Sequence, residues 1–137
     1  MMPDLPEYEH FIYSLPDQLE FIKASTLIVK RTSRTSAQVV GTLYFEKELI
    51  LSVLQTVDFF SRRIVDYSYE VYQGPEKLYW YDCWPHPDDP SLLSTFPHHK
   101  HVPPDLKRHR IPAENMSFEQ PNLPRLTKEI EELVVTL

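Results

Sequence analysis

The chain has 137 residues, an apolar fraction of 42% and a formal net charge of −6. A chain of this length fits one domain, and its ordinary apolar fraction argues against general disorder. The acidic balance argues against a general nucleic-acid coat protein, because binding to phosphates draws on clustered cations.

The first elements are predicted to be a lead-in, a short helix and the start of a strand. Residues 3–16 are punctuated by prolines and predict an irregular segment. Asp17 is a plausible N-cap for a short helix that ends near Ser25. The apolar and β-branched residues 26–29 predict a strand start, and the polar residues 30–36 predict a turn.

Four further strands are predicted in the middle of the chain, where apolar and polar residues alternate. Turn signals at Glu46-Lys47 and Gly74-Pro75 separate neighbouring strands, which favours an antiparallel meander. The predicted strands cover residues 37–45, 49–59, 64–72 and 78–83.

The last third of the chain is predicted to hold a loop, a short edge strand and a helix. Residues 85–90 read Pro-His-Pro-Asp-Asp-Pro and must form a loop, because proline cannot donate to a sheet. Residues 96–102 predict a short edge strand. Behind Pro124, apolar residues recur at helical spacing, which predicts a helix from about residue 125 to 135 whose apolar face covers the sheet.

Together these elements predict one α+β domain that spans the whole chain. Its sheet is an antiparallel meander of about five to six strands, with an N-terminal and a C-terminal helix packed on one face. The expected divisions are an irregular lead-in at 1–16, the core sheet with the first helix at 17–102, an irregular segment at 103–123 and the C-terminal helix at 124–137.

The expected compartment follows from the only cysteine, Cys83, which cannot form an internal disulfide and so indicates a reducing environment. Residues 1–5 lack the basic segment and apolar run of a signal peptide. The longest apolar stretches fall far short of a membrane span. We therefore expect a soluble cytoplasmic protein without a membrane partner.

The sharpest chemical signal is Phe-Pro-His-His-Lys-His at residues 96–101. In an extended strand His99 and His101 point to one face, and His98 and Lys100 point to the other. Two histidines can act as base and acid near neutral pH, and a lysine can stabilise charge on a phosphoryl oxygen. These groups suit a metal-independent ribonuclease. The alternative is a solvated polar edge strand, or histidines that pack on aromatic rings.

A second signal lies where the strand of residues 78–83 ends. Asp82 can orient an imidazole by hydrogen bonding, and His86 follows in the loop. The alternative is that Asp82 caps the turn and His86 is simply exposed. A third hypothesis is a zinc site of mixed nitrogen and oxygen ligands from Asp82, His86, His99 and His101, although the spacing matches no standard zinc module.

Candidate substrate contacts come from aromatic and basic residues around these signals. Tyr81 belongs to an aromatic series that can stack unpaired bases, although such a series more often fills a core. Lys107, Arg108 and Arg110 can contact phosphates, although such runs usually form a solvated surface. His98 completes the set of candidate substrate-binding residues.

Four motifs carry a family resemblance. They are Tyr67-Ser68-Tyr69, Leu78-Tyr79-Trp80-Tyr81-Asp82, Pro85-His86 and Thr95-Phe96-Pro97-His98-His99-Lys100-His101. In these motifs the chain resembles the TumE toxin family, whose members are encoded as the toxin half of two-gene toxin–antitoxin pairs. The resemblance covers roughly residues 42–102 and extends loosely to the C-terminal helix. It departs from the family pattern at Pro87, where that pattern has a histidine.

The resemblance implies a growth-inhibiting toxin that is neutralised by a cognate antitoxin, which we expect to be a helix-turn-helix protein. RNA is the inferred substrate, and no cofactor is expected. In this hypothesis His99 and His101 are base and acid, Lys100 stabilises the phosphate, and Asp82 orients an imidazole. A non-catalytic regulatory subunit and a metal-dependent hydrolase stay open as alternatives, as does a homo-oligomer.

Overall fold

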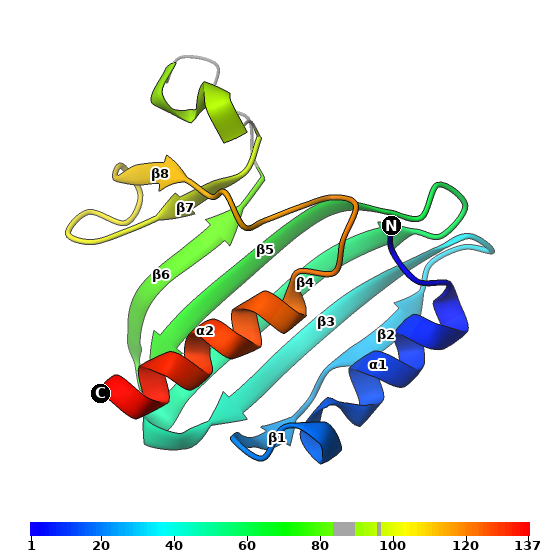
Figure 1. Cartoon of the computed structure of the whole chain (residues 1–137), viewed down its shortest axis with the longest axis horizontal. Helices are drawn as coiled ribbons and strands as arrows, with labels where there is room; N and C mark the ends of the chain where they lie inside the picture. The colour runs from blue at the N-terminus through cyan, green and yellow to red at the C-terminus, as the bar shows by residue number, and fades with distance from the viewer. Residues whose placement is uncertain (84–89, 96) are drawn as a thin grey trace.

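In the computed structural model, residues 1–83, 90–95 and 97–137 are described, and within them two α-helices accompany one antiparallel sheet of eight strands (Figure 1). The helices are α1 (Leu5–Gln18) and α2 (Leu123–Thr136), and two short 3-10 helices cover Glu46–Glu48 and Pro90–Thr95. The strands are β1 (Ile22–Ser25), β2 (Ile28–Arg31), β3 (Ser36–Phe45), β4 (Leu49–Asp58), β5 (Arg63–Gln73), β6 (Glu76–Asp82), β7 (His99–His101) and β8 (Arg110–Pro112).

The sheet follows the order β1-β3-β4-β5-β6-β7-β8, and β2 pairs with β3 further along the same edge as β1. Both α-helices cover the same face of the sheet (Figure 1). The predicted α+β class and the meander from β3 to β6 are therefore confirmed, with more strands than expected. Neither helix in the described residues combines the length and the apolar character needed to cross a membrane.

The core lies between the sheet and the two helices, and it contains a series of buried polar side chains joined by hydrogen bonds. Tyr67, Tyr69 and Val71 alternate along β5 toward the helices and are all buried, as the period of a strand requires. The Gln55 side chain on β4 donates to the Tyr8 hydroxyl on α1 and accepts from the Tyr69 hydroxyl. These bonds satisfy polar groups that burial would otherwise leave unpaired.

The predicted irregular lead-in at 3–16 is wrong, because α1 occupies most of it. The Asp4 side chain caps the helix by accepting from the Glu7 backbone N–H at 2.9 Å. Pro6 falls in the first turn, where its missing N–H costs nothing. The buried side chains of α1, namely Tyr8, Ile12 and Leu15, recur at helical spacing and hold the helix on the sheet.

The short helix predicted from Asp17 to Ser25 is also wrong. Asp17 lies in the last turn of α1 instead of capping a new helix, and residues 22–25 form strand β1, which pairs with β3. The backbone N–H of Leu19 returns to the Leu15 carbonyl and ends α1. The second half of the segment predicted as a helix therefore adds one strand to the sheet.

The edge strand predicted at 96–102 is an interior strand, β7, of three residues. It pairs with β6 on one side and with β8 on the other, where Lys100 lies opposite Ile111. Strand β8 falls within the segment predicted to be irregular, because Arg-Ile-Pro is too short and too proline-rich to read as a strand. The loop predicted at 85–90 lies, apart from Pro90, outside the described residues. The predicted C-terminal helix is confirmed as α2.

Candidate active site

The candidate site is built by two neighbouring strands. Asp82 at the end of β6 lies directly opposite His99 on β7, and Trp80 lies opposite His101. Residues paired in this way point to the same face of a sheet. Tyr81, between Trp80 and Asp82, points to α2, so the four side chains lie on the face away from that helix.

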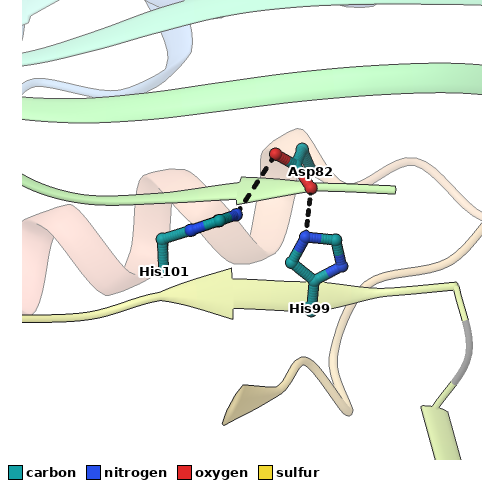
Figure 2. A group of neighbouring side chains, drawn as sticks. All are labelled: Asp82, His99 and His101. Carbon is teal, nitrogen blue, oxygen red and sulfur yellow. Dashed lines mark ion pairs between the residues drawn. The ribbon is translucent and has the colours of Figure 1, made fainter. Parts of the chain in front are cut away.

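The two histidines converge on one carboxylate (Figure 2). His99 Nε2 forms an ion pair with Asp82 Oδ1, and His101 Nε2 lies 3.4 Å from Asp82 Oδ2. The indole N–H of Trp80 also donates to Oδ2, at 3.0 Å. All three residues of the cluster are buried, with exposed fractions of 8% for Asp82, 1% for His99 and 5% for His101.

Backbone carbonyls hold the other nitrogen of each imidazole. His99 Nδ1 lies 3.1 Å from the Pro97 carbonyl oxygen, and His101 Nδ1 lies 2.6 Å from the Leu106 carbonyl oxygen. Because a carbonyl only accepts, each Nδ1 must carry a proton. The rings are fixed further by stacking of His101 on Trp80, with centroids 3.9 Å apart. Both Nε2 atoms are thereby aimed at Asp82.

The carboxylate of Asp82 is held in its charged form. Burial raises its pKa, but hydrogen bonds from His101, His99 and Trp80 lower it by more, so the pKa lies well below its ordinary value. The cluster therefore places a fixed negative charge between two imidazoles. Such a charge orients the two rings.

Lys100 does not join this cluster, because the sheet separates them. Its Nζ lies 4.2 Å from the ring centroid of Tyr79 and 3.7 Å from Glu129 Oε1 on α2. The hydroxyls of Tyr79 and Tyr81 donate to the same Glu129 carboxylate at 2.9 and 2.8 Å. Tyr81 and Lys100 therefore belong to a second polar group, beneath α2.

His98 also lies on the α2 side of the sheet. Its Nδ1 is hydrogen-bonded to the Tyr67 hydroxyl, and its ring packs 4.5 Å from that of Phe118. Burial and the neighbouring His99 lower the pKa of His98. This packing matches the alternative in which a histidine of the stretch rests on aromatic rings, and it sets His98 apart from His99 and His101.

Of the predicted basic contacts, Arg110 is the one on the face of the cluster. It pairs with His101 across β7 and β8, so its side chain shares that face. Lys107 and Arg108 are exposed in the connection between these strands, and Arg108 lies 3.8 Å from Asp105. His86 lies outside the described residues.

Sequence reasoning missed two contributors to these groups. Trp80 stands two residues before Asp82, so strand alternation could have placed both on one face. Glu129 had no such signal, because its contact with Tyr79 and Tyr81 depends on how α2 crosses the sheet. The donor atoms of Asp82, His99 and His101 lie within 4.8 Å of one another, a set that can hold a metal ion.

Comparison with known proteins gives one result. The model of the family described as Toxin TumE matches residues 11–134, nearly the whole chain. The searches of curated proteins and of solved structures found no match. The matched range includes β6 and β7 with the cluster and most of α2, and it extends beyond the resemblance seen in the sequence to most of α1.

Proposed function

We propose that this chain, which belongs to the TumE toxin family and is the toxin component of a toxin–antitoxin system, inhibits growth by cleaving RNA at Asp82, His99 and His101. The observation that carries the proposal is the convergence of two histidine Nε2 atoms on one buried carboxylate. An acid, a base and a group that orients them are the parts that RNA cleavage through the 2′-hydroxyl needs.

The contacts of the ring nitrogens support different roles for the two histidines. Both ring nitrogens of His99 face oxygen acceptors, and we assign His99 the role of acid. His101 Nε2 has the longer contact, 3.4 Å, with an oxygen that already accepts from Trp80. When Nε2 carries no proton, a substrate hydroxyl can replace this contact and donate to it, so we assign His101 the role of base.

The bond changes follow from these roles. His101 takes the proton of the ribose 2′-hydroxyl, and the oxygen attacks the adjacent phosphorus. The bond from phosphorus to the 5′-oxygen breaks, and His99 gives that oxygen its proton. The products are a 2′,3′-cyclic phosphate and a 5′-hydroxyl. Asp82 keeps both imidazoles in place during the transfer.

The cation of the reaction is assigned to Arg110 in place of Lys100. Arg110 lies opposite His101 on the face of the cluster, whereas Lys100 is held beneath α2 by Glu129. A guanidinium can bind two oxygens of one phosphate at once, which suits a phosphorane better than a single ammonium does.

The partner of the toxin is proposed to be a helix-turn-helix antitoxin encoded by the neighbouring gene. The net charge of −6 favours a basic or strongly apolar partner surface. Co-expression with that gene should raise the soluble yield and relieve growth inhibition. If the product of the neighbouring gene neither binds in a pull-down nor changes growth, it is not the antitoxin.

The reaction is tested by incubating total RNA with untagged protein in the presence of a chelator. The wild-type protein and a His10→Ala variant, which changes an exposed histidine on α1, should cleave RNA and inhibit growth. His99→Ala and His101→Ala should lose both activities while the circular dichroism spectrum is kept. Cleavage and toxicity that persist in the double variant would show that the histidines are not part of the reaction.

A further inference from the structure

We propose that Asp82, His99 and His101 also form a binding site for one divalent transition-metal ion of the zinc type, and that this ion competes with RNA cleavage. The site itself is argued from geometry alone. The competition rests on the proposed function, because it assumes that cleavage uses the same Nε2 atoms.

The ligand set is the first argument. Two imidazole nitrogens and one carboxylate oxygen come from the neighbouring strands β6 and β7, and all lie within 4.8 Å of one another. Zinc binds imidazole and carboxylate in tetrahedral sites, whereas magnesium and calcium prefer oxygen alone. Two histidines in a set of three therefore favour the zinc type of ion.

The orientation of the rings is the second argument. A histidine that binds a metal through Nε2 usually donates its Nδ1–H to a carbonyl or a carboxylate, which fixes the tautomer. His99 does so with Pro97, and His101 does so with Leu106. Both rings are therefore held with Nε2 toward a common point before any ion arrives, and less entropy is lost on binding.

The spacing of the donor atoms is the third argument. Zinc bonds of about 2.0–2.1 Å at tetrahedral angles separate neighbouring ligand atoms by about 3.4 Å. The separation of His101 Nε2 from Asp82 Oδ2 is 3.4 Å. His99 Nε2 contacts Oδ1 directly, so this ion pair must open as the ion enters, with loss of the shared proton. The three donor atoms, which lie within 4.8 Å of one another, must also move closer together around the ion.

Competition follows from the use of the same lone pairs. An ion bound at Nε2 of His101 removes the lone pair that takes the substrate proton, and an ion at Nε2 of His99 replaces the proton that the acid must give. RNA cleavage by the bound form should therefore stop, and a chelator should restore it.

Binding is tested on untagged, metal-free protein by titration calorimetry with zinc chloride. The wild-type protein should bind one ion per chain, and His10→Ala should bind it equally. Asp82→Asn and His101→Gln should weaken binding by at least about tenfold. Because these replacements can disturb the fold, cobalt(II) is added to the wild-type protein as an independent probe. The visible absorption of tetrahedral cobalt supports the site, and a spectrum of hydrated cobalt overturns it.

RNA cleavage in the same samples separates this inference from the proposed function. Zinc binding with loss of cleavage supports both. Zinc binding with cleavage that requires zinc supports the site and overturns metal-independent catalysis. Equal zinc affinity in the wild-type protein and His101→Gln overturns the site, whereas cleavage that then persists in chelator leaves the proposed function standing.

Discussion

At the scale of single residues, successive side chains along β7 point to opposite faces of the sheet, and this alternation decides what each one contacts. His99 and His101 lie at odd positions and contact Asp82, whereas Lys100 between them contacts Glu129 under α2. Three consecutive residues therefore serve two separate polar groups. Cations near in sequence are not interchangeable here, because the sheet lies between them.

This separation gives a prediction for Arg110 and Lys100. Arg110→Ala should lower the rate of RNA cleavage by about 100-fold, as does removal of one group that stabilises transition-state charge. Lys100→Ala, on the other face, should lower it by no more than about threefold, because any effect passes through the sheet. Single-turnover cleavage of one RNA measures both rates. A larger loss of cleavage rate in Lys100→Ala than in Arg110→Ala would show that Lys100, and not Arg110, stabilises the phosphate.

A second residue prediction concerns Gln55, which is fully buried and joins the Tyr8 and Tyr69 hydroxyls. Gln55→Leu removes both bonds and leaves a buried hydroxyl without its partner, so the free energy of unfolding should fall by about 2–3 kcal/mol. Urea denaturation followed by circular dichroism measures this loss. Gln38→Leu, on the other face of the sheet, is the control and should change stability by less than about 0.5 kcal/mol. Equal losses of stability in the two variants would contradict a stabilising role for the hydrogen bonds of Gln55.

At the scale of elements, β1 and β2 pair with the same edge of β3, and the link between them requires a glycine. Thr26 and Leu27 in this link lie against Gly41 of β3, whose φ is +141°. A Cβ built on Gly41 would lie 2.6 Å from the Thr26 carbonyl oxygen and 2.9 Å from Leu27 Cα. Both neighbours are backbone atoms, so relief requires the two short strands to move.

Gly41→Ala is therefore expected to lower the free energy of unfolding by more than about 2 kcal/mol, because steric overlap adds to backbone strain. Gly74→Ala is the matched control. Its φ is +57°, and the nearest atom to an added Cβ is the flexible carboxylate of Glu48 at 3.5 Å. It should cost about 1 kcal/mol, from the left-handed conformation alone. Denaturation midpoints that rank the two variants in the opposite order would refute the packing argument.

The helices and strands also show which parts of the fold could be predicted from local sequence patterns. Period-two alternation and turn residues predicted β3 to β6, and the same alternation predicted that His99 and His101 share a face. Helix α1 was not predicted because its prolines indicated an irregular segment. Pro6 is in fact tolerated in the first turn, and Asp4 supplies the N-cap. Strand β8 was hidden because its pairing with β7 is a tertiary contact. The burial of the histidines and the contact of Lys100 with Glu129 depend on such pairing and packing, so local patterns could not show them.

At the scale of the whole molecule, tyrosines connect the sheet to both helices. Tyr8 lies on α1, Tyr67 and Tyr69 lie on β5, and Tyr79 and Tyr81 lie on β6, where both donate to Glu129 of α2. Burial raises the pKa of each hydroxyl well above its ordinary value, and the Glu129 charge raises those of Tyr79 and Tyr81 further. The folded state therefore requires these buried tyrosine hydroxyls to stay protonated.

Stability should consequently fall steeply at alkaline pH. A pKa raised in the folded state gives a contribution that is complete below the pKa of the unfolded chain, about 10, and is lost as pH rises above it. Five such groups acting together make this loss cooperative. We expect the tyrosinate absorbance of these five residues to appear together with the loss of the circular dichroism signal above about pH 10. Tyr13→Phe, which removes an exposed tyrosine, should leave this transition at the same pH, whereas Tyr69→Phe should shift it upward. Ionisation of all eight tyrosines in a single step near pH 10, with the fold intact, would contradict the burial argument.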